Sequence, residues 1–188
     1  MADSNLKLDY IDEQEYLEGE KLADNRHEYV DGKVYAMAGS SKRHNRIAGN
    51  LYRSLLSAGQ QGCDAYIGDI KVRIERRNSY YYPDVVVGCE ESDNADDYYL
   101  EKPCLIIEVL SPSTEKKDAT EKLLAYQDIE SLQAYLMVDQ QQCHISLIYR
   151  QKNGHWWVKT FTELDDMISL SCPEMEIKVT DIYENISF

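Results

Sequence analysis

Two short apolar runs in this chain each carry one carboxylate, and these acids are the side chains best suited to chemistry. Asp84 lies in the run 83–87, and Glu108 lies in the run 105–110. Both runs are short, rich in β-branched residues and without polar alternation, which predicts strands buried on both faces. A buried carboxylate without a partner is costly, so such groups are normally paired or bound to a metal ion. Two of them on strands that could lie side by side therefore indicate a cation site.

The chemistry of two carboxylates suits a hard divalent cation. Mg²⁺ typically takes one or two carboxylates, keeps several waters and binds substrate phosphates. We expect Asp84 and Glu108 to supply these carboxylates and the backbone carbonyl of Val109 to be a third ligand. The alternative is that one or both acids end a strand and face water.

A lysine further along the chain could act beside these acids. Asp118, Lys122 and Tyr126 follow one another at four-residue steps, so on a helix they share one stripe. Neighbouring apolar residues place this stripe in the inward arc of the helix rather than on its outer face. An ammonium there could orient or deprotonate a metal-bound water and offset charge on a phosphate, with Asp118 positioning it. The alternative is an ion pair without a catalytic role.

The N-terminal part of the chain predicts elements that could complete such a site. Asp31-Gly32 between alternating flanks predicts a hairpin over residues 27–37. Ser41 offers the N-cap of an amphipathic helix over residues 41–58. His44 extends the apolar face of that helix at its N-terminal end.

The rest of the pattern predicts alternating helices and strands. Strands at 64–68 and 69–75 would form a meander, with Lys71 and Arg73 on a face in water. The other expected elements are helices over 11–22, 115–129 and 181–185, a surface loop over 90–102, a strand over 133–138, a hairpin of strands 143–149 and 155–161, and edge strands over 168–170 and 176–179. This order predicts a single α+β (mixed α/β) domain over residues 1–188.

The composition predicts a protein of a reducing, cytoplasmic compartment. No apolar run approaches the roughly 20 residues needed to span a bilayer, and the polar, acidic start is not a secretory signal. Five cysteines are scattered without a Cys-x-x-Cys pair, which indicates reduced thiols and argues against zinc. Several lie in apolar runs, where we expect small core residues.

The charge limits the choice of partners. A net charge of −14 disfavours tight non-specific binding to nucleic acid, because phosphate binding usually needs a basic footprint. Two basic clusters, at 42–46 and 71–77, could provide a local basic footprint, although both could equally be solvated faces. The tyrosine runs 80–82 and 98–99 could mark a homodimer interface or pack within strands.

Several of these residues together resemble a known family. The run Glu-Val-Leu-Ser-Pro-Ser-Thr at 108–114, with the Asp, Lys and Tyr that follow it, is specific, whereas Pro83-Asp84 alone is weak. With the segment 27–34, His44 and the run 134–139, these residues look like the Uma-type restriction endonucleases of the PD-(D/E)XK nuclease superfamily. The resemblance spans residues 11 to 160.

The resemblance implies a fold and an activity. The fold would be a restriction-endonuclease-like core, with a central mixed β-sheet flanked by helices and an N-terminal hairpin. The activity would be Mg²⁺-dependent hydrolysis of phosphodiesters by a DNA endonuclease, with Mn²⁺ as a substitute and no organic cofactor. Asp84 and Glu108 would bind the metal, Glu28 would be a further acid near it, and His44 would line the mouth of the site. For His44 a satisfied core histidine is the alternative.

The chain departs from the superfamily at one position. The superfamily usually carries a lysine two residues after the glutamate, where this chain has Leu110. Lys122 would supply the missing amine from the helix, and Tyr126, one turn further on, would be an accessory residue.

Other functions stay open at this point. Leu110 and the net charge favour a catalytically inactive nuclease-fold binding module, and the tyrosines allow a homodimeric interaction module. A phosphodiesterase for a small molecule would use the same metal chemistry. For a nuclease, we expect DNA as substrate, a homodimer and no association with a membrane.

Overall fold

The largest sheet of the protein has six strands and is mixed, as predicted. The computed structural model describes residues 10–57, 62–89, 97–111 and 118–188. Strand β8 runs antiparallel to β6 and parallel to β9. The strand order is β11-β10-β9-β8-β6-β3, with bounds β3 Asp64–Ile67, β6 Val85–Gly88, β8 Pro103–Leu110, β9 Ala134–Asp139, β10 Ile145–Arg150 and β11 Trp156–Phe161.

A second sheet of five strands includes the N-terminal hairpin. Its order is β2-β1-β5-β4-β7, with bounds β1 His27–Val30, β2 Lys33–Ala36, β4 Lys71–Ile74, β5 Ser79–Tyr81 and β7 Tyr99–Leu100. The predicted meander over 64–75 is therefore wrong, because β3 pairs with β6 in one sheet and β4 pairs with β5 in the other. The expected loop over 90–102 is also corrected, since β7 lies within it. A separate hairpin joins β12 (Met167–Ser171) to β13 (Glu174–Lys178).

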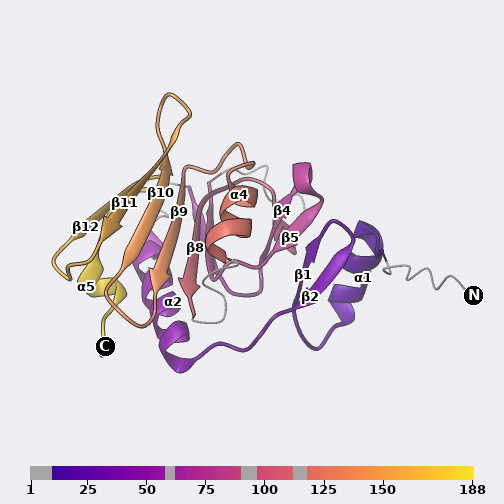
Figure 1. Cartoon of the computed structure of the whole chain (residues 1–188), viewed down its shortest axis with the longest axis horizontal. Helices are drawn as coiled ribbons and strands as arrows, with labels where there is room; N and C mark the ends of the chain where they lie inside the picture. Colours follow the sequence, from indigo (N-terminus) through magenta and orange to yellow (C-terminus); the bar gives the residue numbers. More distant parts are fainter. Residues whose placement is uncertain (1–9, 58–61, 90–96, 112–117) are drawn as a thin grey trace, which may run out of the picture.

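Two helices pack on opposite faces of the six-stranded sheet, α2 (Lys42–Leu55) on one and α4 (Leu123–Tyr126) on the other. The other helical segments are α1 (Glu13–Leu22), the 3₁₀ turn η2 (Glu75–Arg77), the π-helical turn η4 (Asp118–Lys122) and α5 (Val179–Ile182). The helix expected over 115–129 ends at Tyr126, and its first three residues lie outside the described part of the chain. In Figure 1, β12 and α5 lie at the left, next to the β11 and β10 edge of the six-stranded sheet. The elements α1, β1 and β2 lie at the right, beyond β4 and β5.

Helix α2 forms and docks for the reasons that its sequence predicts. Its N-cap is Ser41, whose hydroxyl accepts a hydrogen bond of 3.1 Å from the backbone N–H of His44. Ile47, Leu51 and Leu55 share one face of the helix and are fully buried. They pack in one cluster with the odd-numbered residues of β6 and β8, including Val85.

The other face of the six-stranded sheet packs against α4 and the second sheet. Even-numbered residues such as Val86 and Ile106 form a cluster with Ala125 and Tyr126 of α4 and with Val72 of β4. Because side chains alternate along a strand, Glu108 of β8 points to this same face, toward α4.

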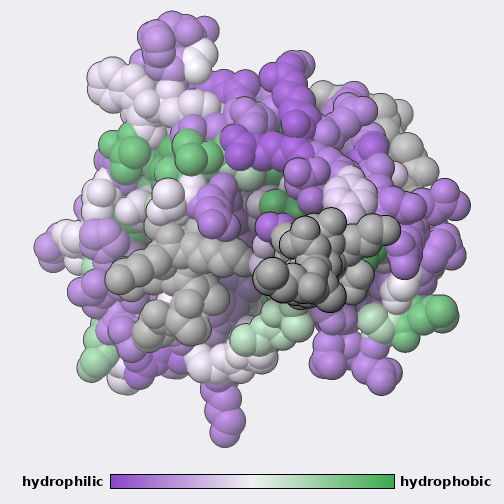
Figure 2. All heavy atoms as spheres, turned by 45° about the vertical axis from the view of Figure 1, so that its right-hand side comes forward, coloured by the Kyte–Doolittle hydropathy of each residue, from purple (hydrophilic) through white to green (hydrophobic). Residues whose placement is uncertain are grey.

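On the face shown in Figure 2, hydrophilic side chains surround smaller apolar groups. No helix within the described ranges has the length and apolar character needed to cross a bilayer.

One expectation about exposure is wrong, and one of two alternatives for the tyrosines is decided. Lys71 was expected on a wet face, but it is buried, with Nζ 5.5 Å from the ring centroid of Tyr82 and 5.9 Å from that of Tyr98. The run 80–82 is buried as well. These three tyrosines therefore pack inside the protein and offer no interface.

Four of the five cysteines come together in two disulfides, so the expectation of dispersed, reduced thiols is wrong for this structure. Cys63 and Cys89 form one disulfide, and Cys104 and Cys172 form another. Cys63 and Cys104 are buried in the core, as expected of small apolar residues. Cys143 is in neither disulfide.

The turn between β1 and β2 allows a test of the fold. Asp31 and Gly32 have positive φ angles of 43° and 85°, as a type I′ turn requires. A Cβ at Gly32 would collide with the ring of Tyr10. We expect Gly32→Ala to lower the free energy of unfolding by at least about 1 kcal/mol, because alanine resists this backbone conformation. Denaturant titration measures the change.

The matched control is Gly49→Ala in the interior of α2. No atom lies within 4 Å of the Cβ that this substitution adds, and alanine is the better helix former by about 0.5 to 1 kcal/mol. The two variants should therefore change stability in opposite directions. A stable Gly32→Ala protein would show that the turn is not of this type.

Candidate active site

The two strand acids come together because of the register of β6 and β8. Val85 lies opposite Ile107 in this antiparallel pair. The next position along brings Asp84, just before β6, beside Glu108 of β8. The two acids therefore meet where β6 begins and β8 nears its end.

A cavity of about 500 Å³ opens at this end of the strands. Its walls come from both sheets, from the N-terminus of α2 and from η4. The lining residues are Glu28, the segment 35–41, His44, Tyr82, Asp84, Glu108, Val109, Ser111, Lys122 and Gln140.

The ammonium of Lys122 lies between two buried carboxylates. Its Nζ is 2.8 Å from Oε1 of Glu28 and 3.0 Å from Oε1 of Glu108. The three side chains are between 6% and 9% exposed. A buried charge needs a close partner to offset the loss of hydration. One ammonium shared by two carboxylates gives each carboxylate such a partner and leaves one negative charge in excess.

A tyrosine also holds the Glu108 carboxylate. The Tyr126 hydroxyl donates a hydrogen bond of 3.0 Å to Oε1 of Glu108. Burial, and secondly the nearby Glu108 charge, raise the pKa of Tyr126 well above its usual value. The tyrosine therefore stays protonated and remains a donor across the physiological pH range.

Asp84 has different partners and more contact with water. Its Oδ2 accepts a hydrogen bond of 2.7 Å from the Val109 N–H and lies 3.1 Å from Nε2 of His44. The Asp84 side chain is 22% exposed, and that of His44 is 12% exposed. One oxygen of Asp84 is thus fixed in place, and the carboxylate still borders the cavity.

The structure places most of the predicted site residues around this one cavity. The cavity is lined by Asp84, Glu108, Lys122, Glu28 and His44. Tyr126 is not among the lining residues but donates a hydrogen bond to Glu108. Val109 also lines the cavity, but the contact observed is made by its N–H, so its carbonyl as a ligand stays a prediction. The side chain of Asp118 lies outside the described residues, and its positioning role stays a prediction as well.

Sequence reasoning missed Gln140, which ties three elements together behind the cavity. Its Nε2 donates to the Leu110 carbonyl at 3.1 Å, and its Oε1 accepts from the Ser41 hydroxyl at 2.7 Å. Its backbone carbonyl accepts from Nη1 of Arg43 at 3.3 Å. Gln140 could have been found from its position directly after β9, because β8 and β9 are parallel and end at the same edge of the sheet.

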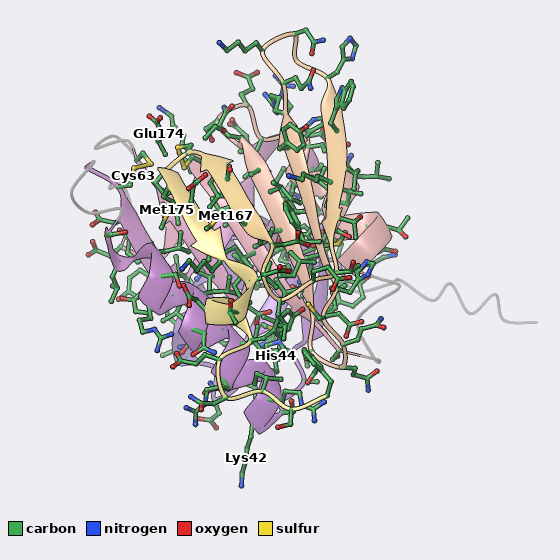
Figure 3. All side chains as sticks on the ribbon, turned by 90° about the vertical axis from the view of Figure 1, so that its left-hand side faces the viewer. Lys42, His44, Cys63, Met167, Glu174 and Met175 are labelled. Atoms are coloured by element: carbon green, nitrogen blue, oxygen red, sulfur yellow. A yellow bond between two sulfur atoms is a disulfide. The ribbon has the colours of Figure 1, made fainter. Side chains whose placement is uncertain are left out.

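The two basic clusters have different environments. In the cluster 71–77, Arg73 pairs with Glu13 and Glu101, Arg76 with Glu130, and Arg77 with Asp128. The arginines of this cluster are thus paired with carboxylates of the protein itself. In the cluster 42–46, Lys42, Arg43 and Arg46 are exposed. Figure 3 shows Lys42 and His44 at the same end of α2, which is the end that borders the cavity.

The donors around the cavity suit a hard divalent cation. Asp84 and Glu108 offer two carboxylates, which is the number that Mg²⁺ commonly takes from a protein, and the cavity has room for the waters that it keeps. Within the described residues, the set of three Cys, His, Asp or Glu ligand atoms lying within 4.8 Å of one another is formed by cysteines elsewhere. The cavity therefore suits a metal site in which water and substrate complete the coordination of the ion, and not one in which side chains supply all the ligands.

Fold and site together define a restriction-endonuclease-like domain. A crystal structure from Anabaena variabilis, described as a putative nuclease belonging to DUF820, superposes with a TM-score of 0.72 at 18% identity, covering 90% of this chain and 96% of that one. The Uma2 family model, described as "Putative restriction endonuclease", matches residues 13–180. The chain belongs to this family, so the resemblance inferred from the sequence is confirmed.

Two relatives from Synechocystis sp. strain PCC 6803 extend the comparison. One uncharacterized protein is 35% identical over 177 residues, covering 93% of this chain and 92% of the relative. A second is 36% identical over 149 residues, covering 78% and 84%. The similarity thus runs over nearly the whole chain.

The shared ammonium leads to a prediction about stability. Lys122→Met would leave Glu28 and Glu108 buried without a cation, which costs about 3 to 5 kcal/mol when one partner of a buried pair is removed. We expect a loss of this size in the free energy of unfolding, measured by urea titration. Adding Glu28→Gln to the variant should recover part of the loss, because it removes one uncompensated charge.

The control is a lysine in an exposed pair. Lys21 lies 3.0 Å from Glu18, and both side chains are about half exposed or more. Lys21→Met should change stability by no more than about 0.5 kcal/mol, as is usual for surface substitutions. Equal effects at the two lysines would contradict the role given to Lys122.

Proposed function

We propose that the protein is a Mg²⁺-dependent phosphodiester hydrolase that cuts DNA as an endonuclease, with Mn²⁺ as a substitute for Mg²⁺. The observation that carries the proposal is the position of Lys122, whose Nζ lies 3.0 Å from Glu108 in the cavity that Asp84 also lines. The usual superfamily lysine is missing, because Leu110 stands in its place. The helix supplies an amine to the same acid, which favours an active enzyme over an inactive relative.

The metal would be held by the carboxylates of Asp84 and Glu108. Such an ion acts as a Lewis acid on a phosphoryl oxygen and lowers the pKa of a bound water. The neighbouring donors would support this chemistry by fixing the orientation of the two carboxylates.

Each carboxylate is oriented by fixed donors. The Val109 N–H and His44 hold Oδ2 of Asp84, while Tyr126 and Lys122 hold Oε1 of Glu108. Groups locked in this way need little rearrangement during a reaction, which is the main source of electrostatic catalysis.

Lys122 adds positive charge beside the place of reaction. The ammonium of Lys122 would offset negative charge that develops on a phosphate during hydrolysis. Glu28 keeps Lys122 in position from the opposite side, at 2.8 Å. Glu28 therefore serves as the partner of the lysine, in addition to being an acid near the metal.

DNA as the substrate is supported by the basic N-terminus of α2. The exposed residues Lys42, Arg43 and Arg46 lie beside the cavity, where they can contact phosphates on either side of the scissile bond. The net charge of −14 makes general affinity for DNA low. Binding is therefore local to this edge and depends on salt.

We also propose that the chain forms one domain over residues 1–188 and acts in the cytoplasm as a homodimer. The uninterrupted family match over residues 13–180 supports the single domain. Sedimentation equilibrium tests the dimer, and a monomer at micromolar concentration would remove it.

The activity is tested by nicking of supercoiled plasmid in Mg²⁺ or Mn²⁺. Asp84→Asn and Glu108→Gln keep the size of each side chain and remove its charge. We expect each to reduce the rate at least about 100-fold, the loss typical of a group that stabilises the transition state. Lys122→Ala should lose activity to a similar degree.

The matched control is Glu130→Gln, which changes a carboxylate that is 79% exposed and far from the cavity. Its nicking rate should equal that of the native chain. Near-UV circular dichroism confirms that each variant is folded. Equal rates for the native protein, Asp84→Asn and Lys122→Ala would remove the assignment, and no nicking by any of them would support the inactive binding module.

His44 allows a separate test of the metal. Its Nε2 lies 3.1 Å from Oδ2 of Asp84, so its removal should act through the orientation of that carboxylate, and such partners typically change metal affinity about 10-fold to 100-fold. We expect His44→Ala to weaken Mn²⁺ binding about 10-fold by calorimetry, and His44→Gln to restore part of it. His155→Ala, in the exposed turn between β10 and β11, should have no effect. Unchanged affinity in His44→Ala would rule out this positioning role.

A further inference from the structure

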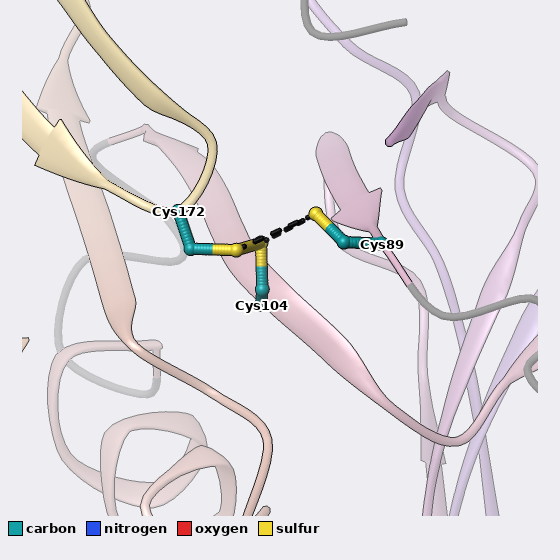
Figure 4. A group of neighbouring side chains, drawn as sticks. All are labelled: Cys89, Cys104 and Cys172. Carbon is teal, nitrogen blue, oxygen red and sulfur yellow. Dashed lines mark hydrogen bonds between the residues drawn. A yellow bond between two sulfur atoms is a disulfide. The ribbon is translucent and has the colours of Figure 1, made fainter. Parts of the chain in front are cut away.

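Four cysteines from four separate segments meet at one point of the structure. Cys63 precedes β3, Cys89 follows β6, Cys104 lies in β8, and Cys172 lies in the turn between β12 and β13. Sγ of Cys89 is 3.3 Å from that of Cys104 and 3.4 Å from that of Cys172, as Figure 4 shows. Cys63 is joined to Cys89, so all four sulfurs form one cluster.

This cluster is distinct from the candidate active site. Both sites lie on the strands β6 and β8, but Asp84 and Glu108 mark one end, while Cys89 and Cys104 mark the other. Glu108 lies four positions after Cys104 in β8, which is about 13 Å along a strand. In Figure 3, Cys63 and His44 lie at opposite ends of the region around α2.

We propose that Cys63, Cys89, Cys104 and Cys172, once both disulfides are reduced, bind one Zn²⁺ ion as a four-thiolate site. The absence of a Cys-x-x-Cys pair argued against zinc when the sequence alone was considered. That rule applies to ligands from one local loop, whereas here strand ends and a hairpin turn bring single cysteines together.

The sulfurs of Cys89, Cys104 and Cys172 have spacings that suit a thiolate centre, and Cys63, joined to Cys89, would be the fourth ligand. A Zn–S distance of about 2.3 Å in a tetrahedron puts neighbouring sulfurs about 3.8 Å apart. The two distances from Cys89 are within about half an ångström of this value, and the sulfurs of Cys89, Cys104 and Cys172 all lie within 4.8 Å of one another.

The surroundings also favour a structural ion. Cys63 and Cys104 are each 5% exposed, and Cys89 and Cys172 are partly buried against the same core. Four protein ligands and little access for water are typical of structural zinc, whereas catalytic zinc keeps an open position. The ion would join the two central strands to the β12–β13 hairpin and to the segment that follows α2.

Reduction of the two disulfides needs a reductant, and a dithiol can supply the electrons. Each S–S bond takes up two electrons and two protons and becomes two thiols, while one dithiol is oxidised to a disulfide. Zn²⁺ then displaces the four thiol protons and forms four Zn–S bonds, so metal uptake releases protons and weakens as the pH falls.

The test uses the full chain, reduced under anaerobic conditions and titrated with Co²⁺ as a coloured substitute for Zn²⁺. We expect one equivalent to give sulfur-to-cobalt charge-transfer bands and the visible bands of tetrahedral Co²⁺, and Zn²⁺ to abolish both. Cys89→Ser and Cys172→Ser should weaken the binding at least tenfold. Cys143→Ser, the matched cysteine control, should leave it unchanged.

Two further measurements separate this site from the carboxylates and from misfolded variants. Asp84→Asn should retain the full charge-transfer signal, because carboxylates give none, and this holds whether or not the protein proves to be a nuclease. In the native chain, Zn²⁺ should protect four thiols from alkylation, counted by mass spectrometry. The proposal is overturned if the reduced native chain shows no thiolate bands with Co²⁺, or if Zn²⁺ leaves all five thiols open to alkylation.

Discussion

The contact between one ammonium and two carboxylates is the interaction on which the arrangement of the layers depends. Glu28 belongs to the five-stranded sheet, Glu108 to the six-stranded sheet, and Lys122 to the helical turn between them. None of the three could be buried alone without a large loss of hydration energy. The three charged groups therefore come together where the two sheets approach each other, at the place where the apolar packing between the sheets gives way to a cavity.

The antiparallel pair β6 and β8 gives this arrangement a stiff axis. Its odd-numbered side chains pack on α2 and its even-numbered ones on α4, so neither strand can rotate without exposing apolar surface. The acids occupy one end of the pair and the cysteines the other. Since both ends are anchored to other elements, the orientation of Asp84 and Glu108 depends on packing along the entire strand pair.

Local sequence signals predicted the elements well but not their partners. The Asp31-Gly32 turn, the Ser41 cap and the acids of β6 and β8 follow from neighbouring residues, and the structure contains each of them. The division of β3 and β4 between two sheets did not follow, because strand pairing depends on contacts distant in sequence. Lys71 was misplaced for a similar reason, since Tyr82 and Tyr98 bury it from other segments. The link made by Gln140 likewise depends on tertiary structure.

The position of Glu28 in the N-terminal hairpin has a consequence for the emerging polypeptide. The partner that steadies Lys122 is made early in synthesis, the acids of the central strands later, and the lysine itself later still. A partly synthesised or unfolded chain thus has the separate groups but not their geometry. For the proposed nuclease, the geometry needed for hydrolysis would therefore exist only after the two sheets and the helical turn have packed together.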